Sequence, residues 1–242
     1  MSFNPFNTAP AATDRAAFDE GLRAHMLRVY NYMGIGVGLT GLVAWLVATT
    51  PALTQLFFTA QHQPTMLGMI AIFAPLGFIF FFSFAAMRSS LSLLQGLFWL
   101  FCATMGLSMA SLFIIFTNES IARTFFVVAA MFGATSLYGY TTRSDLTKMG
   151  SFMVMGLIGI LLAGVVNLFL HSSGLQFAVS VLGVVIFTGL TAWDTQRIKE
   201  AYAQGYGVET NHKLALFGAL SLYLNFINLF QLMLSFMGTR RD

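Results

Sequence analysis

The chain has 242 residues, of which 57% are hydrophobic and only 9% are charged, and its mean hydropathy is +0.76. This composition excludes an ordinary soluble domain and predicts an all-α protein embedded in the lipid bilayer. The net charge of +3 is the difference between twelve Lys and Arg and nine Asp and Glu. The basic residues are scattered singly among the loops, which excludes a basic patch for nucleic acid.

Seven stretches are long enough to cross a bilayer, since a spanning helix needs about 20 mostly apolar residues. They predict a cytoplasmic arm over 1–28, a seven-helix transmembrane domain over 29–237 and a short tail over 238–242. Three interpretations of the arm stay open: partial disorder, an amphipathic helix along the membrane surface, or an extension of the first helix. The predicted spans are 29–48, 66–87, 91–116, 124–141, 150–170, 177–193 and 214–237.

The basic residues predict the orientation of these spans. Nine of the twelve Lys and Arg lie in the arm or in the alternate gaps on its side, so the N-terminus should be cytoplasmic. Seven crossings would export Arg240 and Arg241, against this rule, which leaves open a last segment that enters the membrane and returns.

Small residues four apart occur within the first and fifth spans, as Gly34 with Gly38 and Gly159 with Ala163. This spacing predicts close packing of helices. The four histidines fall in different polar segments, without the spacing of a zinc site or a catalytic base. We therefore expect no enzyme activity and no cofactor.

Asp194 directly follows the apolar run 177–193. A carboxylate at this depth costs a few kcal/mol unless it has a partner or water, which indicates a functional site. A cap at the lipid headgroups is the alternative.

The last span carries a polar line at helical spacing, consisting of Ser221, Asn225, Asn228, Gln231 or Leu232, and Ser235. Such a line should face the bundle interior. It can hold helices together, at about 0.6 to 2 kcal/mol per contact. Together with Asp194 and Arg88, it favours instead a polar route with a charged gate at the cytoplasmic end.

Three segments carry a family resemblance: the stretch SLYGYTTRSDLTKMGSFMVMGLIGILLAGVVNLFL, the WDTQRIK end of the sixth span and GALSLYLNFINLF of the seventh. They resemble the Bax inhibitor family, especially its bacterial members. The resemblance implies a seven-helix bundle with the last helix at its centre, a pH-sensitive calcium leak, roles in stress tolerance and a bacterial inner-membrane location. For some bacterial members it also implies modulation of a membrane-bound AAA protease.

The resemblance also implies a site. In the family, an aspartate ending the sixth span pairs with a second in the seventh, and an arginine at the inner end of the second span latches the pair. These positions match Asp194, Asn225 and, through a weaker motif, Arg88. Two close carboxylates share a proton and titrate as a unit, whereas an aspartate beside an amide does not.

Calcium binding would also be weaker with one carboxylate fewer. We therefore predict a calcium leak with weak pH dependence, in which Asp194 contacts calcium transiently and Ser221 and Asn228 line the path. A non-conducting regulatory protein that binds a protease or another membrane protein is the alternative.

Overall fold

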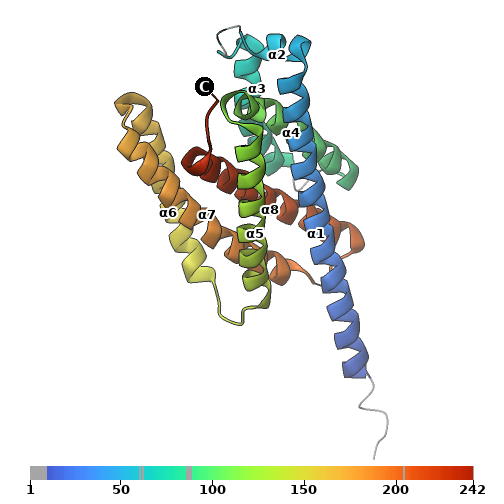
Figure 1. The fold of residues 1–242 in the computed structure, drawn as a ribbon. Helices are drawn as coiled ribbons and strands as arrows, with labels where there is room; N and C mark the ends of the chain where they lie inside the picture. The colour runs from blue at the N-terminus through green and yellow to red at the C-terminus, as the bar shows by residue number, and fades with distance from the viewer. Residues whose placement is uncertain (1–9, 60, 62, 86–88, 204, 242) are drawn as a thin grey trace, which may run out of the picture.

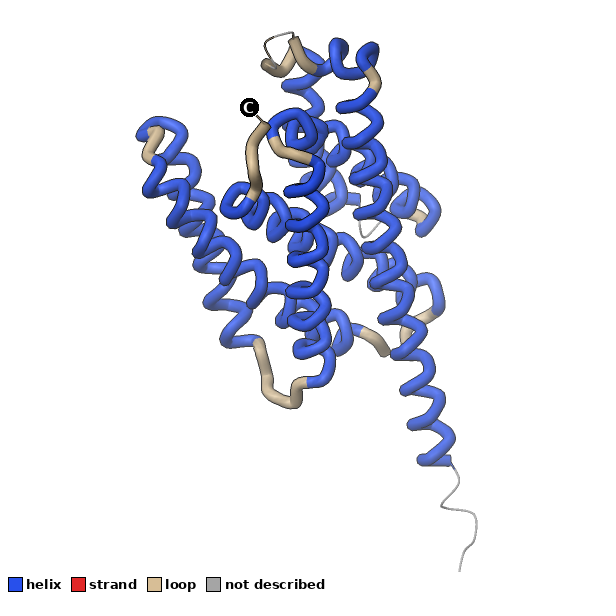
Figure 2. The backbone as a smooth tube through the Cα atoms, in the orientation of Figure 1, coloured by secondary structure: helices blue, strands red, loops and turns tan. Residues whose placement is uncertain are grey.

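The computed structural model describes the backbone of residues 10–59, 61, 63–85, 89–203 and 205–241. All regular secondary structure in these residues is α-helical, as predicted, with isolated β-bridges alone outside the helices (Figures 1 and 2). The helices are α1 (Pro10–Thr49), α2 (Pro51–Phe57), α3 (Met66–Ala85), α4 (Leu91–Ile115), α5 (Asn118–Thr141), α6 (Thr147–Leu170), α7 (Ser173–Ala201) and α8 (Val208–Met237).

Six of these helices are long and apolar enough to cross a membrane, namely α1 from Ala17 onward and α4 to α8. α3 is apolar as well, but the stretch of it whose side chains are described, Met66–Phe82, is too short for that test. The fold is therefore a helical membrane bundle with six candidate spans, and the count of seven stays a prediction.

The last helix lies at the centre of the bundle. α8 runs obliquely behind α5 and α1 and packs against α1, α4, α5 and α7 (Figure 1). Of its most apolar 18-residue window, 61% is buried, against 28 to 33% in α1, α4, α5 and α7. A helix this enclosed can carry polar side chains without presenting them to lipid.

α6 lies at the edge of the bundle. It packs against α7, and only 6% of its most apolar window is buried. α3 is similarly peripheral and packs against α4 and the short helix α2. Both helices leave large apolar surfaces exposed to the membrane.

Glycines set the position of α7. A Cβ atom on Gly139 of α5 would lie 2.2 Å from the carbonyl oxygen of Ala192, and one on Gly218 of α8 would lie 3.0 Å from Ile198. The prediction from small-residue spacing was wrong, because Gly34, Gly38 and Gly159 all face open space. Spacing alone does not say which side of a helix meets a neighbour.

The two ends of the described chain lie at opposite ends of the bundle (Figure 1). α1 is continuous from Pro10 through the predicted arm, and α8 is one uninterrupted helix. After α8, Thr239 accepts a hydrogen bond from the backbone N–H of Thr117, and the N–H of Arg241 donates to Ile115. The tail is thus fixed to the α4–α5 turn, away from the N-terminal end, which does not support a returning last segment. We call this end of the bundle the tail end.

Candidate functional site

Asp194 lies in α7, seven residues before the helix ends at Ala201. It is 5% exposed and is the one buried acidic side chain among the residues whose side chains are described. Because α7 continues past the predicted span, the residues beyond Asp194 add about 10 Å of helix. With this extension α7 reaches the middle of α8, where Asp194 meets Ser221 and Asn225.

Three side chains contact the Asp194 carboxylate. Ser221 Oγ donates to Oδ2 at 2.7 Å, and Asn225 Nδ2 donates to the same oxygen at 2.8 Å. Ser221 and Asn225 are one turn apart on α8 and so share a face. Arg197 Nη2 lies 3.2 Å from Oδ1. Hydrogen bonds to a charged acceptor are stronger than neutral ones, so this cluster ties α7 to α8.

Arg197 closes the cluster toward the N-terminal end of the bundle. Its side chain is 56% exposed, and its guanidinium lies 4.9 Å from the centre of the Trp193 ring. The latch was predicted at Arg88, which lies outside the described residues. Arg197 was missed, although Asp and Arg three apart on a helix are a recognised pairing.

A chain of hydroxyl groups begins one residue after Asp194. Thr195 Oγ1 lies 2.9 Å from Ser136 Oγ of α5, which lies 2.7 Å from the Tyr30 hydroxyl of α1. Tyr30 and Ser136 also line an open cavity of about 730 Å³ between α1 and α5, whose rim carries Asp19 and Arg23. These hydrogen bonds could not be predicted from the sequence, because they depend on which helices are neighbours.

The predicted polar line of α8 does not form one continuous path. Asn228 Nδ2 donates to the Leu224 carbonyl of its own helix at 2.8 Å. Further along, Leu232 packs where Gly183 of α7 leaves room. Ser235 reaches a separate cavity at the tail end, shared with Gln176 and Ser180. Ser221 and Asn225 thus meet Asp194, while Asn228 and Ser235 do not.

A second buried polar contact lies elsewhere on α8. The Tyr223 hydroxyl lies 2.6 Å from Thr40 Oγ1, which donates to the Cys102 carbonyl at 2.8 Å. Phe98 and Phe101 pack against the Tyr223 ring. With every polar atom paired among aromatic rings, this contact holds α1, α4 and α8 together.

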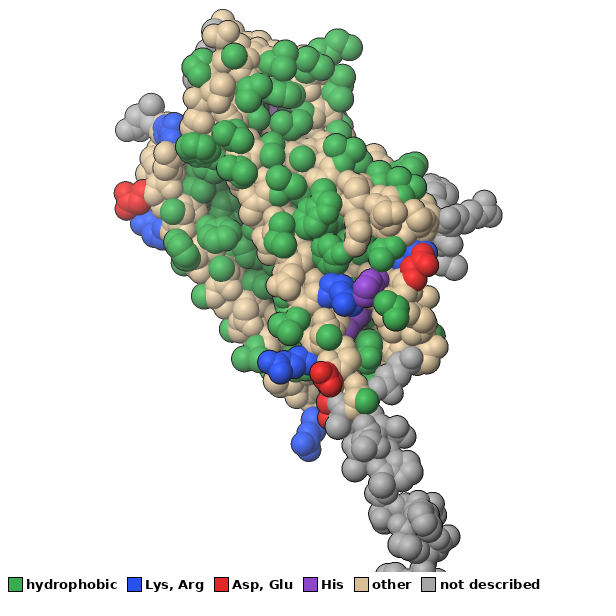
Figure 3. Space-filling view, turned by 90° about the vertical axis from the view of Figure 1, so that its right-hand side faces the viewer, with side chains coloured by type: hydrophobic (Ala, Val, Ile, Leu, Met, Phe, Trp, Pro, Cys, Tyr) green, Lys and Arg blue, Asp and Glu red, His purple; other side chains and the backbone are tan. Residues whose placement is uncertain are grey.

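The described residues contain no group of three or more His, Cys, Asp or Glu that could hold a metal ion. Asp194 and Ser221 together offer oxygen atoms, which suit a brief contact with a hard cation better than a permanent site. Charged and histidine side chains gather mainly toward the N-terminal end on the face shown in Figure 3, and hydrophobic side chains are spread over the rest. Asp194, by contrast, is buried beneath this surface.

Residues 22–242 match the family model described as "Inhibitor of apoptosis-promoting Bax1". The chain is 47% identical over 235 residues to an uncharacterized protein of Rickettsia prowazekii, covering 97% of this chain and 98% of that one. It is 44% identical over 249 residues to an uncharacterized protein of Caulobacter vibrioides, covering 99% and 100%. It is also 44% identical over 223 residues to the inner membrane protein YbhL of Escherichia coli, covering 91% and 94%.

Proposed function

Because the chain belongs to the Bax inhibitor family, we propose that it is a membrane leak pathway for calcium, closed in this conformation and only weakly dependent on pH. In this proposal the protein has seven crossings, a cytoplasmic N-terminus and no enzymatic activity, and it lies in a bacterial inner membrane, as YbhL does. The observation that carries the proposal is the buried carboxylate of Asp194, contacted by Ser221, Asn225 and Arg197.

The cluster has the parts of a closed gate. The guanidinium of Arg197 occupies the side of Asp194 that faces the charged end, so a cation from that end must displace it. Toward the tail end, Leu232 against Gly183 separates the cluster from the cavity around Ser235. Hydrophobic constrictions of this kind gate channels by excluding water. Conduction therefore requires both a released Arg197 and a shift of α8 relative to α7.

Weak pH dependence follows from Asn225. The Asn225 amide donates a hydrogen bond to Asp194, and this bond does not require a proton shared between two carboxylates. A second carboxylate at this position would share a proton with Asp194 and make the contact between α7 and α8 sensitive to pH.

Calcium flux into dye-loaded liposomes tests the proposal. Asp194→Asn should lower the flux at every pH, Arg197→Gln should raise it at neutral pH, and Asn225→Asp should make it depend more steeply on pH. Asn228→Asp is the matched control, because that amide bonds to its own helix and should introduce no comparable pH response. A wild-type protein with the steepest pH response of the set would contradict the role given to Asn225, and unchanged flux in Asp194→Asn would contradict the gate.

A second function has one specific observation in its favour. The lipid-facing surface of α6 is almost wholly exposed, which suits a non-conducting protein that binds a membrane-bound AAA protease or another integral protein. Capture of such a protease from solubilised membranes, retained in Asp194→Asn but lost when alanine replaces Leu161 and Leu168, would favour this function over the leak.

A further inference from the structure

A cavity of about 370 Å³ lies between α1 and α5 in the half of the bundle nearer the tail end. Residues of α4 and α8 complete its walls, and the polar side chains among the described lining residues are those of Thr40 and Asn118, beside the indole of Trp45. Its volume falls within the range of small-molecule sites, about 300 to 1,000 Å³. It is separate from the Asp194 cluster, none of whose residues line it.

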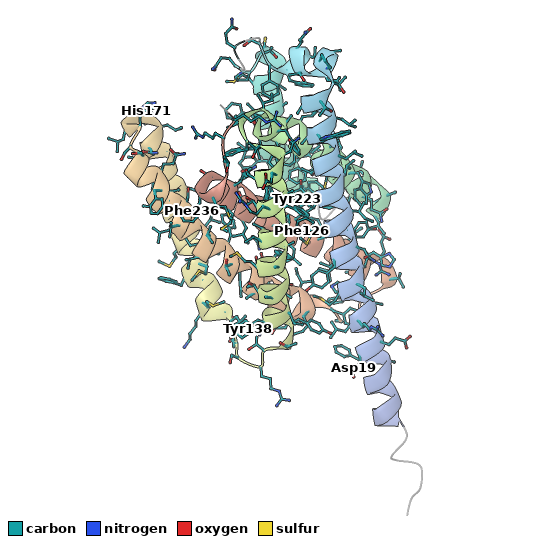
Figure 4. All side chains as sticks on the ribbon, in the orientation of Figure 1. Asp19, Phe126, Tyr138, His171, Tyr223 and Phe236 are labelled. Atoms are coloured by element: carbon teal, nitrogen blue, oxygen red, sulfur yellow. The ribbon has the colours of Figure 1, made fainter. Side chains whose placement is uncertain are left out.

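The mouth of this cavity opens toward the membrane. α1 packs mainly against α4 and α8, and α5 against α7 and α8, so α1 and α5 flank an opening. Trp45 and Phe126 stand at the opening with 47% and 71% of their surfaces exposed, and Figure 4 labels Phe126 on the α1 side of α5. In a bilayer this surface meets lipid acyl chains. If the cavity were empty, its lining atoms would lack the dispersion contacts that an acyl chain provides.

Arginines gather at the same end. Arg241 Nη2 donates to Asn118 Oδ1 at 2.7 Å, so its guanidinium is held beside a residue that lines the cavity. Two backbone hydrogen bonds hold Arg241 in this position. The N–H of Arg241 donates to the Ile115 carbonyl at 2.9 Å, and the N–H of Thr239 donates to Ser120 Oγ at 3.1 Å.

Arg240 and Arg123 are also exposed at this end, with Glu119 as the acidic side chain in the first turn of α5. Arginine is well suited to phosphate, because its planar fork of donors matches the oxygens. Basic sites between spanning helices bind lipid headgroups in this way.

We propose that this cavity binds one acyl chain of a bilayer phospholipid whose phosphate is held by Arg241. The acyl chain enters between Trp45 and Phe126 and fills the space beside Gly41. The residues after α8, which are hydrogen-bonded to the α4–α5 turn, hold the guanidinium over the headgroup. With the orientation given under the proposed function, these arginines are exported, against the usual distribution of basic residues, and the assignment gives them a role at the α4–α5 turn. It does not depend on whether the protein conducts ions.

Photolabelling of the protein in vesicles tests the proposal. The probes are a phosphatidylglycerol with a diazirine in its acyl chain and a diacylglycerol with the same labelled chain but no phosphate. Mass spectrometry locates the labelled residues within 37–45 of α1 and 121–126 of α5. Gly41→Leu fills the cavity, and Gly38→Leu is its control one turn away, because both glycines face open space and Gly38 does not line the cavity.

We expect Gly41→Leu to reduce labelling of these residues about tenfold, while Gly38→Leu leaves it at the wild-type level. Ala122→Phe fills the same cavity from α5 and replaces Gly41→Leu if that variant does not fold. Arg241→Gln should reduce phosphatidylglycerol labelling to the level of diacylglycerol, whereas Arg143→Gln, in the connection between α5 and α6, should not. Equal labelling of Gly41→Leu and Gly38→Leu would overturn the acyl-chain site, and unchanged labelling of Arg241→Gln would overturn the headgroup contact.

Discussion

α6 and α8 are two long apolar helices with opposite surroundings. α6 is the most apolar of the six candidate spans, yet only 6% of its most apolar window is buried. α8 is among the least apolar, and 61% of the corresponding window is buried. Serine and asparagine side chains that contact Asp194 lie on α8, while the exposed side chains in the middle of α6 are apolar.

In this protein, the hydropathy of a helix therefore reports its contact with lipid and not its place in the core. A helix in hydrocarbon must satisfy its polar groups internally, so polar side chains collect on the helix that the others surround. The enclosed helix therefore carries the candidate site, and the peripheral helix carries a surface for lipid or partners. Four substitutions test this contrast.

Leu161→Asp on α6 should have the largest effect. Leu161 is 61% exposed, and moving from Leu to Asp at the centre of a spanning helix costs about 3 kcal/mol. We expect reduced membrane insertion in a translocon assay, while Leu161→Ile inserts normally. If the Asp variant inserted as well as the Ile variant, the exposed face of α6 would not lie in hydrocarbon.

Gly218→Leu on α8 comes next. A Cβ atom there meets Ile198 at 3.0 Å, so a leucine overpacks the α7–α8 contact at a cost of about 2 kcal/mol. Thermal unfolding in detergent should show a clear loss of stability. Gly159→Leu on α6, which faces open space, is the control and should unfold near the wild-type temperature. If both variants lost similar stability, the surroundings of Gly218 in α8 would be no more tightly packed than those of Gly159 in α6.

Part of this contrast could be predicted from the sequence. Long apolar runs predicted the helices, and a carboxylate beside such a run singled out Asp194. Asn225 was placed correctly on the helix face that carries Ser221, since both follow from 3.6-residue periodicity. Asn228 shares the spacing but not the contact, because an amide in a helix can bond the carbonyl four residues earlier. The Tyr30–Ser136–Thr195 chain could not be predicted, because three separate helices supply it.

Asn225→Leu should have a smaller effect than overpacking. It removes one donor from the buried Asp194 carboxylate and leaves Ser221 and Arg197 in place, at a cost of about 1.5 kcal/mol. Asn228→Leu is the matched control on the same helix, because its amide bonds only to the Leu224 carbonyl among the described contacts. Unfolding temperatures of the two variants give the comparison. An equal loss in both would mean that the contact with Asp194 adds nothing beyond an ordinary amide in α8.

Asp145→Asn, at the start of α6, should have the smallest effect and should depend on pH. Hydrogen bonds from the Thr147 hydroxyl and backbone N–H lower the pKa of the exposed Asp145 carboxyl. A lowered pKa in the folded state contributes stability above the ordinary carboxyl range, and this contribution is lost as the pH falls through the lowered pKa. The wild type should therefore unfold at a slightly higher temperature than the variant at about pH 7, and the two should converge as the pH falls below the lowered pKa. The connection before α6 is held to α7 by Gln196, which accepts from the Leu146 N–H and donates to the Ser144 carbonyl. If the difference between the two unfolding temperatures widened as the pH fell, the Asp145 carboxylate would not be the group that stabilises the start of α6.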